Sequence, residues 1–147
     1  MAKTKAGREA AEAAAGDLQT APGEERKARK PRLPKVVSGV VKAALDKKAT
    51  DVVVLDLRQA GGFTDYFILC TGANARQVSA IADSVRERLR EDFDERPAGA
   101  EGTDGAEWVL LDYFDFVVHI FSKECRAYYG LERLWGNAER HAFSDEP

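Results

Sequence analysis

Paired carboxylates are the first residues that could do chemistry, because metal-assisted nucleotidyl transfer needs acidic side chains close together on one face. Asp112 and Asp115 are three residues apart, and in a continuous strand this odd separation sends the two side chains to opposite faces. The carboxylates could converge if they flank a turn, but a turn also explains both residues without chemistry. Asp51 and Asp56 are five apart in a predicted strand and face opposite ways. We therefore predict no metal site.

Phosphate-binding and nucleophilic motifs are also weak. The turn over residues 71–74 contains one glycine and lacks both the G-x-G-x-x-G pattern and a P-loop lysine. Asn74 as a helix N-cap, with Gln77 in a capping box, explains this turn without a nucleotide. Ser79 and Ser122 lack the strained elbow of hydrolase serines. We predict no catalytic residue and no cofactor.

His119 lies in an apolar run, where strand alternation puts it on the same face as Val117 and Phe121. A histidine in this setting is either a hydrogen-bonded structural residue or a base or ligand, and the structural role is the more common one. Cys70 and Cys125 are expected to be reduced thiols in or near the core, because they form no C-x-x-C pair. None of these residues adds a predicted site.

Length and charge favour a single binding domain. The chain has 147 residues, 44% of them hydrophobic and 32% charged, which is enough for one core. Residues 1–35 hold nine Lys/Arg and five Asp/Glu, whereas residues 36–147 hold thirteen and twenty, a net charge of −7. An acidic domain suits a basic protein surface better than bare nucleic acid. No apolar run reaches the ~20 residues of a membrane span and the N-terminus has no apolar signal core, so we expect a cytoplasmic protein.

The apolar patterns predict an α/β fold in which helices flank a mixed β-sheet, in two or three layers. One amphipathic helix is expected from Pro34 to about residue 49 and another after Asn74. Strands are expected over residues 51–57, 65–71, 108–113 and 116–122, the last two as a hairpin, and a final helix over residues 123–135.

Composition also suggests the domain organisation. Residues 1–34 form a basic, Ala-rich arm that is predicted to be disordered, residues 35–138 the folded domain, and residues 139–147 a flexible C-terminal tail. The basic run over residues 26–32 is either a solvated tail or a weak electrostatic contact to RNA.

Aromatic residues remain as candidates for binding. Trp108, Leu110 and Asp112 share one face of a predicted strand, and residues 129–135 contain a second aromatic cluster. Tryptophan and tyrosine beside a carboxylate resemble the hot spot of an interface. The equally supported alternative is that Trp108 and Trp135 pack in the core or at its rim.

Seven segments, taken in order, closely resemble the ribosomal silencing factor family, also called Iojap-like. They are residues 47–57, 64–72, 76–83, 101–102, 108–112, 117–121 and 129–135. Each segment is weak alone, whereas their order and spacing are specific. The resemblance covers about residues 36–136 and implies a fold like that of nucleotidyltransferases, without their catalytic carboxylates.

The resemblance also implies a function. It implies a homodimer, not an enzyme, that binds the large ribosomal subunit at its ribosomal protein number fourteen. Bound there, such a protein blocks joining of the small subunit and represses translation under nutrient limitation. Partner binding is expected at the six residues that match two family motifs: Trp108, Leu110 and Asp112 in the tryptophan-strand motif, and Tyr129, Leu131 and Trp135 in the closing motif. The alternative from another class is a nucleotide-binding or nucleotidyltransferase enzyme that kept this fold.

Two positions depart from the family pattern. Where the family usually has serine, this chain has Ala73 or Ala75, and Asn74 is expected to take over the helix cap. Where the family commonly has glycine, it has Phe114, so the hairpin turn either needs no positive φ or carries strain.

Overall fold

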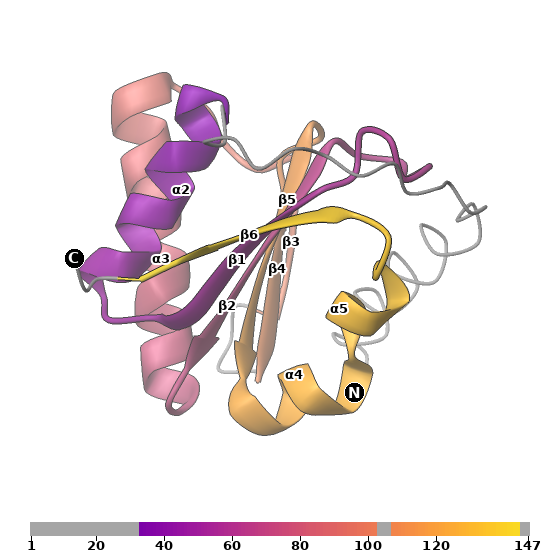
Figure 1. The fold of residues 1–147 in the computed structure, drawn as a ribbon. Helices are drawn as coiled ribbons and strands as arrows, with labels where there is room; N and C mark the ends of the chain where they lie inside the picture. Colours follow the sequence, from indigo (N-terminus) through magenta and orange to yellow (C-terminus); the bar gives the residue numbers. More distant parts are fainter. Residues whose placement is uncertain (1–32, 103–106, 145–147) are drawn as a thin grey trace.

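This computed structural model describes residues 33–102 and 107–144. They form a six-stranded mixed β-sheet flanked by helices. The strand order is β3-β4-β5-β2-β1-β6. Helices α2 and α3 cover one face and the short helices α4 and α5 lie on the other, so the fold has three layers (Figure 1). The predicted fold class is confirmed. The elements are α2 (Lys35–Asp46), β1 (Thr50–Asp56), β2 (Tyr66–Gly72), α3 (Ala75–Phe93), β3 (Gly99–Glu101), β4 (Trp108–Asp112), β5 (Phe116–Ser122), α4 (Lys123–Tyr129), α5 (Leu131–Leu134) and β6 (Glu139–Phe143).

Strands β2 and β5 form the centre of the sheet and pair in parallel, with Tyr66 beside Phe116 and Gly72 beside Ser122. All seven residues of each strand are buried, which is the pattern of strands covered on both faces. Strands β1 and β4 pair antiparallel with β2 and β5. Because both faces of the central pair are apolar, the chain must supply a covering layer on each side.

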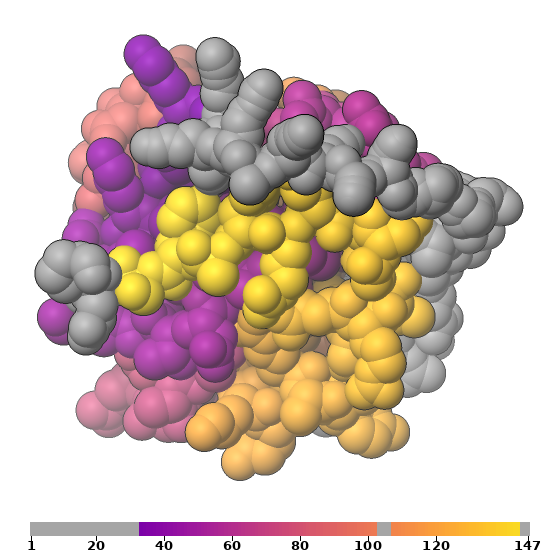
Figure 2. All heavy atoms as spheres, in the orientation of Figure 1, coloured from indigo at the N-terminus to yellow at the C-terminus, as the bar shows by residue number. Residues whose placement is uncertain are grey.

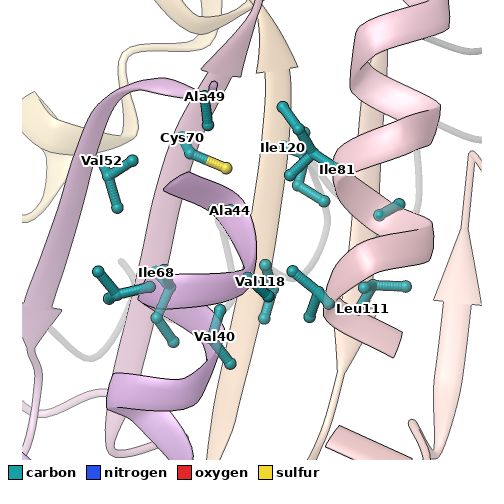
Figure 3. Close-up of a cluster of buried hydrophobic side chains, with 14 of the residues drawn as sticks. Val40, Ala44, Ala49, Val52, Ile68, Cys70, Ile81, Leu111, Val118 and Ile120 are labelled. Atoms are coloured by element: carbon teal, nitrogen blue, oxygen red, sulfur yellow. The ribbon is translucent and has the colours of Figure 1, made fainter. Parts of the chain in front are cut away.

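The larger core lies between the sheet and helices α2 and α3. Strand alternation sends one set of side chains to this side, and the two helices present small and branched apolar residues toward it. Figure 3 shows where the two sets meet: Val40, Ala44 and Ile81 from the helices, and Ile68, Leu111, Val118 and Ile120 from the strands.

Helix α3 begins at the predicted cap. The Asn74 side chain accepts a hydrogen bond from the Gln77 N–H at 2.9 Å, so Asn74 supplies the capping oxygen. The Gln77 side chain accepts from the Ala73 N–H at 2.6 Å, one residue before the N–H that a capping box uses. These bonds give the turn between β2 and α3 a structural role.

The β4–β5 turn carries backbone strain, which is one of the two alternatives that the sequence allows. Phe114 has a φ of +81°, a region that bulky residues rarely adopt. The Asp112 carboxylate accepts a hydrogen bond from the Phe114 N–H at 2.9 Å, and the Thr64 hydroxyl donates to the Phe114 carbonyl at 2.8 Å. Asp112 therefore holds a tight turn, as the turn interpretation of this residue predicts.

Three regions differ from the sequence-based prediction. Residues 99–101, which lie outside the four predicted strands, form β3 against β4. The predicted helix over residues 123–135 is broken at Gly130, whose φ of +53° separates α4 from α5. Residues 139–143, predicted as part of a flexible tail, form β6 on the edge of β1. Edge strands are paired mainly through their backbone, so the polar sequence of β6 did not indicate a strand.

The folded domain therefore extends beyond residue 138, to at least Phe143. The predicted disordered arm lies outside the described residues except at its last two positions, 33 and 34. No helix within the described ranges is long and apolar enough to cross a bilayer.

Gly72→Ala tests the close approach of α3 to the end of β2. A Cβ at Gly72 would lie 3.0 Å from the Val78 backbone nitrogen and 2.9 Å from its Cγ2 atom. Because backbone cannot give way cheaply, we expect the free energy of unfolding in urea to fall by about 1–3 kcal/mol. Gly99→Ala is the control, since a Cβ there meets no described atom within 4 Å. Equal destabilisation by the two changes would contradict this packing.

Candidate partner-binding surface

Four of the six predicted binding residues are core residues. They are Trp108, Leu110, Leu131 and Trp135, each at most 8% exposed and all in the core between the sheet and helices α4 and α5. Asp112 and Tyr129 are partly exposed. In this conformation both tryptophans pack in the core, which is the alternative that the sequence left open. They support a surface from beneath and do not form it.

Trp108 is hydrogen-bonded to His119. Its Nε1–H donates to His119 Nδ1 at 3.1 Å, so the imidazole proton is on Nε2. The Tyr129 ring packs against Trp108 with the ring centroids 4.6 Å apart, and Phe67 meets His119 edge-on at 4.6 Å. His119 is thus the hydrogen-bonded structural residue that the sequence favoured. It lies on the sheet face that carries α4 and α5.

Burial keeps His119 neutral. The side chain is fully buried, and this burial lowers its pKa from 6.5 to about 3, because the interior disfavours the charged imidazolium. Its Nε2 atom has no hydrogen-bond partner within the described ranges. With so low a pKa, His119 is a poor general base.

Helices α4 and α5 and the following Trp135 form a short bent segment, the α4–α5 cap (residues 123–135), over this face. The Ser122 side chain starts α4 by accepting a hydrogen bond from the Cys125 N–H at 3.2 Å. Gly130 ends α4 in the left-handed conformation that glycine adopts most easily. After this bend, Trp135 reaches back to the sheet and meets Phe67 edge-on, with the ring centroids 6.1 Å apart.

Arg126 anchors the cap to the sheet. Its guanidinium donates to the Asp51 carbonyl at 2.6 Å and to the Thr71 hydroxyl at 2.8 Å, so it joins α4 to β1 and β2. The same group donates two further hydrogen bonds to the Glu132 carboxylate, at 3.2 and 2.9 Å, across the break at Gly130. These hydrogen bonds hold the pKa of Glu132 below its usual value. One side chain therefore fixes both helices.

The outer side of the cap exposes apolar side chains that are not among the six expected binding residues. Tyr128 is 80% exposed and Leu134 is 38% exposed. Tyr128 stands edge-on to Tyr129, with the ring centroids 4.9 Å apart, and Tyr129 in turn covers Trp108. In the space-filling view, the orange and yellow surfaces of the cap and of β6 adjoin one another (Figure 2).

A sequence signal for Tyr128 exists, but the helix break hides it. A continuous helix would place residues 128, 131 and 135 on one apolar face, which would bury Tyr128 with Leu131 and Trp135. The adjacent pair Tyr128 and Tyr129 is the better guide, because neighbouring residues in a helix cannot both face the core.

The described residues form no metal-binding group, and the two cysteines are separate. No set of three or more His, Cys, Asp or Glu within the described ranges is placed to hold a metal ion. Cys70 and Cys125 are free thiols, as the sequence predicts. Burial raises the pKa of Cys70 to about 12 and that of Cys125 to about 11, so both are protonated and weakly nucleophilic at neutral pH. The feature of this side of the sheet that could bind a partner is therefore its partly apolar surface, which includes Tyr128 and Leu134.

His119 should make the fold sensitive to mild acid. Its pKa is about 3 in the folded state and about 6.5 in the unfolded state, so the unfolded state takes up the proton first as the pH falls. The stability that depends on neutral His119 is complete above about pH 6.5 and is lost progressively toward pH 3. We expect this residue to lower the free energy of unfolding by about 2 kcal/mol between pH 7 and pH 5.

His119→Asn is the matched control for this pH effect, since its side-chain carbonyl can accept from Trp108 but does not titrate. Urea denaturation at pH 5, 6 and 7 measures both proteins. Identical pH dependence in the two would contradict a buried, neutral His119.

Arg126→Met tests the anchoring of the cap. The change removes the donor to the Asp51 carbonyl and leaves the Glu132 carboxylate with the longer 3.4 Å bond from Arg140, so we expect a loss of about 2 kcal/mol in unfolding free energy. Amide hydrogen exchange over residues 123–135 should also become faster. Arg133→Met removes an exposed guanidinium from the same cap and should change stability by less than about 0.5 kcal/mol. Native stability in the Arg126→Met variant would refute the anchor.

Comparison with known proteins identifies the family. A family model described as "Ribosomal silencing factor during starvation" matches residues 30–147. The ribosomal silencing factor of Bacillus subtilis is 43% identical over 93 residues, which are 63% of this chain and 78% of the relative. That of Halalkalibacterium halodurans is 44% identical over 98 residues, 67% and 83% of the two chains. The chloroplast Iojap protein of maize is 39% identical over 99 residues, but these are 42% of its length.

Solved structures agree. A crystal structure of a Chromobacterium violaceum protein has a TM-score of 0.67 and 32% identity, and the match covers 80% of this chain and 91% of that one. A Bacillus halodurans structure has a TM-score of 0.61 and 40% identity, with 69% and 93% covered. The matched family model spans every described element from α2 to β6. The chain therefore belongs to the ribosomal silencing factor family, the family that its sequence segments resemble.

Proposed function

We propose that this protein silences translation by binding the large ribosomal subunit and blocking the joining of the small subunit. The observation that carries the proposal is the family match over residues 30–147, whose description names ribosome silencing during starvation. Repression under nutrient limitation is part of the proposal. The protein acts as a wedge and makes or breaks no covalent bond.

Steric occlusion needs only that the bound protein occupies space that the small subunit requires. Its strength then depends on how long the protein stays bound compared with the time between encounters of the subunits. Affinity and residence time must come from a few well-placed contacts. The mechanism needs no cofactor. The alternative is a nucleotide-binding or nucleotidyltransferase enzyme. Within residues 33–102 and 107–144, no group of three or more His, Cys, Asp or Glu is placed to hold the metal ion that nucleotidyl transfer uses.

The partner proposed on the large subunit is its ribosomal protein number fourteen. Residues 36–147 carry a net charge of −7, which favours fast encounter with a basic protein surface. Charge of this sign disfavours direct contact with RNA phosphates. A protein partner that is itself bound to RNA, and therefore basic, is the best match.

Burial changes which residues are proposed to touch this partner. Of the six residues expected from the sequence, Asp112 and Tyr129 are accessible enough for direct contact. The other four are proposed to position the surface: Trp108, Leu110, Leu131 and Trp135. Tyr128, which is more exposed than any of the six, joins the proposed contact set. Tyrosine is a frequent anchor in interfaces because it is large, rigid and amphipathic.

Three further expectations stay proposals. We propose that the protein forms a homodimer in the cytoplasm. The basic arm, residues 1–34, lies almost entirely outside the described residues, and a weak contact of this arm with RNA is proposed from its charge alone.

Sucrose-gradient sedimentation with separated subunits tests the proposal. We expect the native protein to travel with large subunits and to lower the fraction of joined ribosomes. Tyr128→Ala should weaken large-subunit binding by about 2 kcal/mol, roughly thirtyfold, without loss of stability, because an exposed side chain contributes little to the fold.

Lys42→Ala, an exposed change on α2 at the opposite face of the sheet, is the control and should bind normally. Native protein that sediments apart from large subunits would refute the proposed function. Normal binding by the alanine variant at position 128 would remove only that residue from the contact set.

A further inference from the structure

Two loops at one end of the sheet expose phenylalanine side chains. Phe114 in the β4–β5 turn is 75% exposed, and Phe63 in the β1–β2 loop is 52% exposed. The loops are joined by two hydrogen bonds: the Thr64 hydroxyl donates to the Phe114 carbonyl at 2.8 Å, and the Asp65 N–H donates to the Asp115 carbonyl at 3.0 Å. The two rings are therefore carried by one connected piece of backbone.

The Phe114 side chain contributes little to the stability of the fold. Its φ of +81° is costly for a residue with a large side chain, and three quarters of that side chain faces solvent. An exposed phenylalanine also loses the gain that burial of its ring would bring. Glycine would fit this turn without strain. The ring is thus explained better by something outside this chain than by the stability of the turn.

The surroundings of these rings are acidic. Residues 56–65, 94–98, 112–116 and 139 meet at this end of the sheet, because Asp56 pairs with Tyr66 and Glu139, and Asp112 pairs with Gly99 and Val117. We call these residues the acidic end. Both of its arginines, Arg58 and Arg96, are paired with aspartates of the same end. Five carboxylates of the acidic end form no ion pair within the described ranges: Asp65, Glu95, Asp112, Asp115 and Glu139.

We infer that Phe63 and Phe114 form an aromatic docking pair that inserts into a lysine- and arginine-rich protein surface of the large ribosomal subunit. The inference rests on the proposed function and adds a second contact to it. Asp112 connects the two contacts, because it shares a strand face with Trp108 and Leu110 and its carboxylate holds the Phe114 N–H. The two accessible residues of the first contact therefore mark the two ends of β4: Tyr129 packs on Trp108 at one end, and Asp112 holds the Phe114 turn at the other.

Charge selects this partner over two others. Five carboxylates at the same end of the sheet as the rings would repel RNA phosphates. A two-fold contact between two copies of this chain would bring two acidic ends together, which is also unfavourable. A basic protein surface with an apolar recess satisfies the carboxylates and the rings at once.

Phe114→Gly separates binding from folding. Glycine relieves the positive φ, so thermal denaturation should show a Tm equal to or above that of the native protein. Affinity for purified large subunits, measured by biolayer interferometry on immobilised protein, should fall by about ten- to thirtyfold. Phe114→Tyr keeps an aromatic ring and should retain native binding, whereas Phe63→Ala should weaken binding in the same direction.

Charge is tested with matched variants. Asp65→Asn with Asp115→Asn removes two charges from the acidic end and should slow association and flatten its dependence on salt. Asp83→Asn with Glu87→Gln removes two exposed charges from α3 and should change neither.

Each outcome decides a different claim. Absence of binding by the native protein would overturn the proposed function and this inference together. Native binding that Phe114→Gly leaves unchanged would overturn the docking pair alone. Phe114-dependent binding to extracted ribosomal RNA, free of protein, would overturn the assignment of a protein partner.

Discussion

A central pair of strands that is apolar on both faces determines the rest of this structure. Strands β2 and β5 bury every residue, so water must be excluded from both sides of the sheet. Two long helices do this on one side (Figure 1). On the other side, the helical cover among the described residues is the short α4–α5 cap, residues 123–135. Large aromatic residues meet this need with few residues, since each buries a large area.

The use of a few large aromatic residues as a cover affects the proposed binding surface. Tyr129 and Trp135 are drawn inward to cover Trp108 and Phe67, and Arg126 holds the cap in place through hydrogen bonds to the sheet. The side chain that is left outside, Tyr128, stands on a rigid support. Preorganised aromatic groups lose little conformational entropy on binding. The residues that carry the family resemblance can therefore matter for binding without touching the partner.

The sequence predicts the parts of the fold that have a strong apolar pattern. The four predicted strands follow from their apolar patterns. The cap at Asn74 follows from the side-chain oxygen that asparagine offers at a helix N-terminus. The structural role of His119 follows from its place in an apolar strand. The polar strand β6 could not be found this way, because it is held by backbone pairing to β1. The break at Gly130 was also missed, since glycine is tolerated within helical patterns. Without that break, exposed and buried aromatic residues could not be told apart.

The most direct test of the wedge is the order of addition in a subunit-joining reaction followed by light scattering. The protein is added either to large subunits before the small subunits, or to ribosomes that have already joined. Occlusion predicts strong inhibition in the first order and little effect on joined ribosomes over the same time, because the binding site is then covered. Equal rates of joining with and without the protein in the first order, at saturating protein, would contradict the account.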